Sequence, residues 1–75
     1  MNARQRKQVE QIISKLSEIQ TEIEVLRDEE QDKYDGMPDG LQESERGCAI
    51  QEAADQLDYA ADSVQDAIDY LTDIN

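Results

Sequence analysis

The chain has 75 residues, of which 35% are charged, and its formal net charge at pH 7 is −12. It contains one cysteine and no histidine, so the sequence predicts neither an internal disulfide nor a zinc site. No apolar run approaches the ~18 residues of a membrane span, and the N-terminus lacks a hydrophobic signal core. We therefore expect a cytoplasmic protein without membrane contact.

The negative charge is concentrated toward the C-terminus. Residues 1–27 carry five basic and four acidic side chains, residues 28–47 carry two and eight, and residues 48–75 carry none and seven. Such a surface repels nucleic-acid phosphate, so we expect no direct nucleic-acid binding. It attracts a basic partner protein, although an acidic surface also serves solubility alone.

A first helix is predicted over about residues 4–34. Its apolar residues recur at alternating spacings of three and four, the heptad pattern of helices that pack on other helices. Ile13 widens this stripe. The heptad positions a and d are occupied by Val9, Ile12, Leu16, Ile19, Ile23 and Leu26.

A joint is predicted over residues 35–43. Gly36 is expected to end the first helix in the left-handed conformation, and Pro38 cannot continue that helix. Leu41 is expected to pack back onto the end of the hairpin. Gly47, unusual in a first helical turn, is expected to allow close approach of backbone from the first helix or from a partner.

A second helix is predicted over about residues 45–74, with Ser44 as its N-cap. Its a and d positions are occupied by Ile50, Ala53, Leu57, Ala60, Val64, Ala67, Leu71 and Ile74. We expect the large side chains of the first helix to pack on the alanine line. The sequence thus predicts an all-α protein with a single domain, residues 1–75, folded as a long antiparallel two-helix hairpin.

Two helices cannot enclose a core, so each should keep an exposed apolar flank. We therefore expect self-association, with two copies forming a homodimeric four-helix bundle of two-fold symmetry. The alternative is that the same flank binds a different protein.

The middle of the chain resembles a known group of proteins. The stretch LRDEEQ, from Leu26 to Gln31, is followed by Pro38 and by LQESERG at residues 41–47. This pattern is similar to the core of short acidic helical-hairpin proteins of phages and prophages in gut-type Firmicutes. The resemblance covers roughly residues 23–75 and implies a mobile-element origin, which would place the protein in the host cytoplasm, but it implies no particular activity.

The second helix presents a candidate partner-binding acidic face opposite its seam. Successive acids lie about one turn apart, which roughly resembles the spacing of phosphates along a DNA strand and suggests DNA mimicry. Two tyrosines lie in the repeated segments LDYAAD and IDYLTD, residues 57–62 and 68–73. The alternatives are an ordinary solvated face and tyrosines at the rim of an oligomer. The face consists of Asp55, Asp58, Tyr59, Asp62, Asp66, Asp69, Tyr70 and Asp73.

Other candidates are weaker. The acids near Gly36 and Gly40 do not fit the ligand positions of a calcium-binding loop, so we expect no metal and no cofactor. The basic residues Arg4, Arg6 and Lys7 are few and lie on an end that we expect to be frayed. Cys48 should be partly exposed and has no histidine to activate it.

The sequence carries no nucleophile–base pair and no phosphate-binding loop, so an enzyme is not expected. We expect an interaction protein that binds and blocks a basic host protein, such as a nucleic-acid-binding or defence protein. One alternative is a structural or assembly accessory that binds through the apolar flank. Another is a sponge for a small nucleotide signal, in which Arg27 and Arg46 would cluster.

Overall fold

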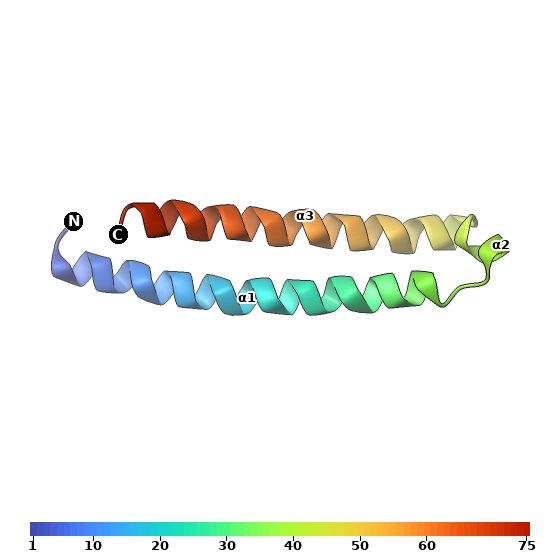
Figure 1. Cartoon of the computed structure of the whole chain (residues 1–75), viewed down its shortest axis with the longest axis horizontal. Helices are drawn as coiled ribbons and strands as arrows, with labels where there is room; N and C mark the ends of the chain where they lie inside the picture. Colours follow the sequence, from blue (N-terminus) through green and yellow to red (C-terminus); the bar gives the residue numbers. More distant parts are fainter.

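The computed structural model describes residues 1–75 and consists of two long helices lying side by side, with a short helix at their joint (Figure 1). The helices are α1 (Ala3–Asp35), α2 (Asp39–Gln42) and α3 (Glu45–Asp73). The molecule measures 58 × 14 × 12 Å, and both chain ends lie at the end opposite the joint. The prediction of an all-helical protein built on a long helix pair is confirmed.

The N-terminal end of α1 is capped rather than frayed. The Asn2 side chain accepts a hydrogen bond from the Gln5 backbone N–H at 2.8 Å, and the Gln5 side chain accepts one from the Asn2 N–H at 3.1 Å. This reciprocal capping box satisfies backbone donors that the first turn cannot pair internally. The expectation of a frayed end was therefore wrong. The sequence signal for the capping box was Asn2 followed by Gln5 three positions later.

The joint reverses the chain without a left-handed residue. Gly36 has φ −81° and ψ −8°, and its N–H donates to the Asp32 carbonyl at 3.0 Å, so the expected left-handed conformation is absent. The Pro38 carbonyl accepts hydrogen bonds from Leu41 and Gln42, which builds α2. The reversal is thus spread over a short extra helix that the sequence did not predict. Leu41 is 52% exposed and does not pack onto the hairpin end as expected.

Gly47 is buried at the start of α3. A Cβ atom built at this position would lie 2.5 Å from the Leu41 carbonyl oxygen and even nearer to that of Gln42. The close approach anticipated for Gly47 is real, but the backbone that approaches belongs to α2, not to α1 or a partner. Glycine is required here because any larger residue would displace the end of α2.

Ser44 is the N-cap of α3, as predicted. Its hydroxyl accepts a hydrogen bond from the Gly47 N–H at 3.2 Å and donates one to the Leu41 carbonyl. One side chain therefore satisfies both the first turn of α3 and the end of α2.

Replacing Ser44 by alanine should lower the free energy of unfolding by about 1 kcal/mol, because the cap of α3 is lost. Urea unfolding followed by circular dichroism would measure this. Ser63→Ala is the matched control, since Ser63 is an exposed residue inside α3 and makes no side-chain hydrogen bond. Equal effects of the two substitutions would contradict a capping role for Ser44.

The seam between α1 and α3 is narrow. The buried apolar side chains are Val9, Ala54 and Ala61, the last two each 2% exposed. The row of α3 that lines the seam follows a spacing of seven and consists of Gly47, Ala54, Ala61 and Ile68. The predicted packing on the alanine line is not found within the hairpin, because Ala60 is exposed and its neighbours in that line, Ala53 and Ala67, are only half-buried.

On α1 the seam includes polar residues. The seam side of α1 contains two rows of residues. One is at position a and consists of Val9, Leu16 and Ile23, and the other is at position e, which the a-and-d pattern did not include. That row is half-buried and consists of Ile13, Gln20, Arg27 and Tyr34. The long polar side chains can lie over alanines with their apolar stems while their polar ends reach partners at the edge. The hairpin therefore packs through positions a and e rather than a and d.

Candidate functional site

The hairpin leaves one apolar face without a partner. Because successive residues advance by about 100° around a helix, two antiparallel helices that pack through a and e place their d positions on the same side of the seam. Ile12 and Ile19 are 45% and 44% exposed, and Leu26 is 51% exposed. We define the apolar face as Ile12, Ile19, Leu26, Ala53, Ala60, Ala67 and Ile74. The remaining residues predicted for helix packing, Ile50, Leu57, Val64 and Leu71, are half-buried at the seam.

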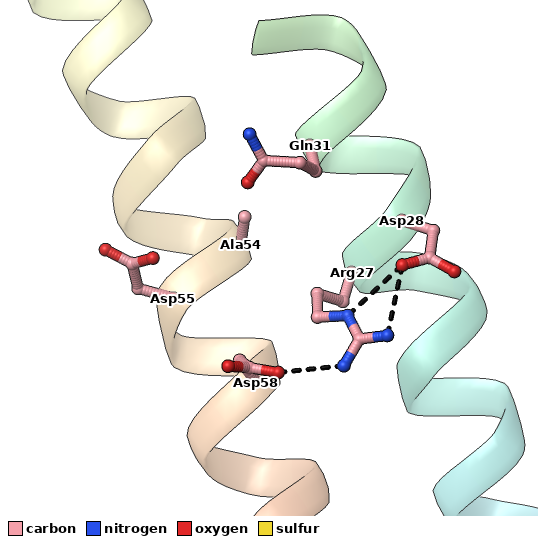
Figure 2. A pocket seen from close by; sticks show the side chains of 6 residues that line it. All are labelled: Arg27, Asp28, Gln31, Ala54, Asp55 and Asp58. Atoms are coloured by element: carbon pink, nitrogen blue, oxygen red, sulfur yellow. Dashed lines mark hydrogen bonds and ion pairs between the residues drawn. The ribbon is translucent and has the colours of Figure 1, made fainter. Parts of the chain in front are cut away.

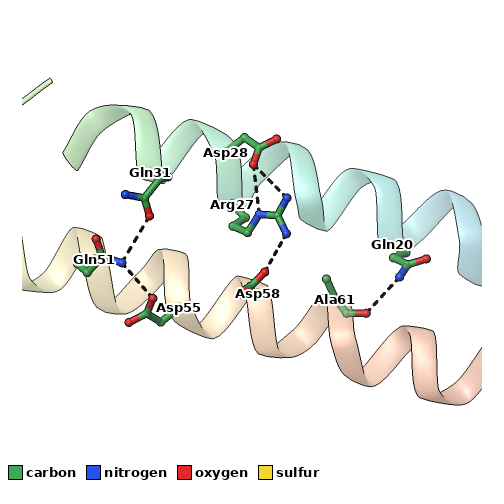
Figure 3. Close-up of polar contacts among 8 residues, drawn as sticks. All are labelled: Gln20, Arg27, Asp28, Gln31, Gln51, Asp55, Asp58 and Ala61. Carbon is green, nitrogen blue, oxygen red and sulfur yellow. Dashed lines mark hydrogen bonds and ion pairs between the residues drawn. The ribbon is translucent and has the colours of Figure 1, made fainter. Parts of the chain in front are cut away.

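The opposite side of the seam is polar and fixes how the helices align (Figure 3). Arg27 donates a hydrogen bond to Asp58 at 2.8 Å. The Gln20 amide donates to the Ala61 carbonyl at 3.4 Å and to the Gln65 side chain at 2.9 Å. These contacts place the middle of α1 beside the middle of α3.

Arg27 lies in a small pocket of about 240 Å³ between the helices (Figure 2). Its guanidinium contacts Asp58 at 2.8 Å and Asp28 at 3.1 Å, and Asp55 also lines the pocket. The hydrogen bond to Asp58 and then that to Asp28 raise the pKa of Arg27 above its ordinary value. The contribution of Arg27 to stability is present below the ordinary arginine pKa and is lost as the pH rises through the raised pKa, so this arginine brings no pH dependence near neutrality.

The pocket around Arg27 is unsuited to an anion, because three aspartates line it and two of them already pair with the single arginine. Arg46 lies elsewhere, in a groove at the joint. Within one hairpin, therefore, the two arginines are not brought together as a nucleotide-binding pair.

The acidic face is fully accessible. All eight residues predicted for it are exposed on α3, and Asp58 is the one that forms an ion pair. Asp55 and Asp69 accept hydrogen bonds from the neighbouring side chains of Gln51 and Gln65, at 3.0 and 2.9 Å. These amides orient two carboxylates without neutralising their charge.

The two tyrosines of the acidic face are strongly exposed, Tyr59 at 62% and Tyr70 at 75%. They occupy neighbouring heptad positions, c and g, so Tyr59 points away from the hairpin while Tyr70 borders the apolar face. Tyr70 is thus the point at which the acidic and apolar surfaces meet.

A groove of about 470 Å³ at the joint was not anticipated from the sequence. Its lining combines two cations with apolar residues and consists of Lys33, Met37, Leu41, Ser44, Arg46 and Ile50. Lys33 and Arg46 occupy the d positions that continue the apolar rows of α1 and α3. The groove is therefore the joint-side end of the apolar face, and the heptad count gave the signal for it.

The remaining candidates stay isolated. No group of three or more acidic, cysteine or histidine side chains is arranged to hold a metal ion. Cys48 is exposed, with its sulfur 3.9 Å from the Glu43 carbonyl. Arg4, Arg6 and Lys7 are exposed on the first turns of α1. None of the helices combines the length and apolar character that crossing a membrane requires.

The class of protein defined by these features is a long helical hairpin with one apolar and one acidic surface. A comparison with models of protein families, with curated proteins and with solved structures finds no match.

Proposed function

We propose that the protein is a non-enzymatic interaction protein of phage or prophage type that binds and blocks a basic protein of its host through the acidic face. Targets with a nucleic-acid-binding surface, including defence proteins, suit this chemistry, because such surfaces are built to receive a row of negative charges. The protein would act by occupying that surface.

The observation that supports this proposal is the unneutralised state of the acidic face. Residues 48–75 contain seven acidic and no basic side chains, and α1 supplies one ion pair to them, from Arg27 to Asp58. The other acids of the face remain exposed to solvent along a rigid helix. Their field steers a basic partner and fixes its orientation along the helix.

Neutralising Asp55, Asp62 and Asp69 to asparagine should release a basic target and leave the fold intact. The measurement is affinity capture from host lysate, washed at low and at high salt, with the captured proteins identified by mass. The wild-type chain should retain the target at low salt and lose it at high salt, since the contact is electrostatic. The triple variant should lose it at both.

The matched control changes the same number of charges on the outer side of α1, with Glu10→Gln, Glu18→Gln and Asp32→Asn. These three residues are exposed, and none forms an ion pair. This variant should capture the target as the wild type does. If both triple variants fail equally, net charge alone governs the binding and the acidic face has no specific role.

The apolar face favours a second candidate function, that of an assembly accessory that binds another viral protein through apolar contacts. Such a partner would survive the high-salt wash and would be unaffected by the acidic substitutions. The nucleotide-sponge alternative has less support, because Arg27 is already paired with two aspartates. Self-association of the hairpin into a homodimer is part of the main proposal.

A further inference from the structure

The hairpin exposes more surface than a compact protein of its mass. Its accessible surface is 5502 Å² for 8.5 kDa, whereas a compact monomer of that mass is expected to expose ~4,650 Å². The excess, about 850 Å², is close to the ~800 Å² that each partner contributes to a standard interface. The elongated hairpin therefore exposes enough extra surface to contribute one side of a standard interface.

We propose that the apolar face binds a second copy of this chain, face to face, with the joint of one copy at the open end of the other. In this arrangement α3 lies antiparallel on the partner's α3, and α1 on the partner's α1. Ala60 then lies opposite the partner's Ala60, and Ala53 opposite the partner's Ala67. On α1, Ile19 lies opposite the partner's Leu26.

The alignment of the two helices within one hairpin supports this arrangement. A single two-fold axis must pass both Ala60 of α3 and the point midway between Ile19 and Leu26 of α1. These two points must therefore lie side by side along the hairpin. The bond from Arg27 to Asp58 and the contact from Gln20 to the Ala61 carbonyl place that part of α1 beside Ala60. One axis therefore satisfies both helix pairs without any change in the hairpin.

Charge complementarity selects the orientation. The charged side chains that continue the apolar face are Lys33 and Arg46, both at the joint-side groove. With the joints at opposite ends, Arg46 lies opposite the partner's Ile74, beside the partner's Asp73 and the negative end of its α3 dipole. With the joints together, the unpaired Arg46 of both copies would instead converge at one end, beside Lys33 residues that Glu30 already pairs.

The rim of this interface is compatible with the same orientation. Lys15 lies nearly opposite the partner's Glu29, an attractive pair. Glu22 lies near the two-fold axis and faces the partner's Glu22. The repulsion between these two carboxylates is weak, because they lie at an exposed rim in water. On α3 the positions next to the apolar face are uncharged, Ala49, Gln56, Ser63 and Tyr70. Apart from Asp73, which Arg46 reaches at the end of the helix, no acid of α3 therefore borders the seam between the two α3 helices.

This dimer changes the acidic face, a consequence that rests on the proposed function. Both α3 helices lie on one side of the bundle and both α1 helices on the other. The outermost residues of the two acidic faces, at heptad position c, then adjoin on that side with two-fold symmetry, and a basic partner would contact both copies there, whereas Asp58 of each copy lies on the side away from the interface. With the joints together, the acidic faces would lie on opposite sides of the bundle and act singly.

The first test is a disulfide at the predicted axis. Ala60→Cys is made in a Cys48→Ser background, so that the new thiol is alone. Closely packed helices ~8 Å apart bring facing Cα atoms within the ~4.4–6.8 Å that a disulfide spans. Mild oxidation should link the variant into a dimer of unchanged helix content. Ser17→Cys, exposed on the polar side of α1, is the matched control and should stay unlinked.

The second test is a charge exchange. Arg46→Glu should weaken the dimer about tenfold by sedimentation, because two symmetric ion pairs become repulsive. Adding Asp73→Arg should restore the wild-type dissociation constant. Within one chain these residues lie at opposite ends of α3, ~40 Å apart, so no contact inside one chain can account for the restoration.

The outcomes separate the two proposals. A dimer that does not link through Ala60 and is not restored by the charge exchange overturns this arrangement. A protein that stays monomeric at high concentration overturns the second copy as the occupant of the apolar face. Either result leaves the acidic-face proposal standing, because the capture experiment with the aspartate variants tests that proposal in its own right.

Discussion

Replacing Gly47 by alanine is expected to lower the free energy of unfolding by about 2–3 kcal/mol, near the upper range for steric overpacking. The added Cβ would lie 2.5 Å from the Leu41 carbonyl oxygen and still nearer to backbone atoms of Gln42. These are backbone atoms of α2, so they cannot move aside as a flexible side chain would. The Leu41 carbonyl also accepts a hydrogen bond from Ser44, the N-cap of α3. Thermal unfolding followed by circular dichroism would show the loss.

The matched control is Gly40→Ala. Gly40 lies in the same joint, its added Cβ would meet no atom within 4 Å, and no glycine of the chain has a positive φ. This substitution should be neutral or stabilising by up to ~1 kcal/mol, because alanine reduces the freedom of the unfolded chain. If Gly47→Ala proved as harmless as Gly40→Ala, α2 would not be held against α3 as described.

The second large effect is expected at Ala61, which is 2% exposed in the seam. Ala61→Leu adds three carbon atoms where α1 lies directly against α3, so the helices must separate or the leucine must leave its preferred rotamers. Such overpacking typically costs ~1–3 kcal/mol, a large fraction of the stability of a chain this small. Urea unfolding would measure the loss.

Asp62→Leu is the control for the size and apolar character of the new side chain, because Asp62 is the next residue of α3 and is exposed on the outer side. It should change the free energy of unfolding by no more than ~0.5 kcal/mol, as exposed substitutions usually do. A similar loss in both variants would mean that the seam does not run along Ala54 and Ala61.

The helices and the cap were predictable because their signals are local. Heptad spacing identifies an amphipathic helix wherever it packs, and Ser44 caps α3 through a residue only three positions away. The apolar stripe of α3 is also evident, since it spans positions a, d and e. These features need no knowledge of the rest of the molecule.

The choice of seam was not predictable in the same way. A stripe that covers a, d and e is symmetric about a, so either d or e can face the other helix. The decision depends on how α2 positions the start of α3 and on polar contacts across the seam, such as that of Gln20. The heptad spacing of the apolar residues favoured d, yet Gln20 and Arg27 reach their partners from the row at e.

The same choice governed how much of the candidate sites could be predicted. The acids of α3 lie opposite either seam, so their exposure followed from the sequence alone. The apolar face and the joint-side groove depended on which row was left outside the seam. The heptad count places Lys33 and Arg46 in the d rows, but that these rows lie outside the seam became evident only after e had been assigned to the hairpin.

The thin, extended seam also determines the order in which the chain can close. Gln31 contacts Gln51 only 20 residues away, whereas Gln20 contacts Gln65 across 45 residues. The entropic cost of closing a loop grows with the logarithm of its length, so the distal contact alone would cost roughly 0.7 kcal/mol more than the one nearer the joint. If pairing of α1 with α3 begins at the joint, each further contact closes only a short additional loop. We therefore expect the two helices to pair progressively from the joint toward the chain ends.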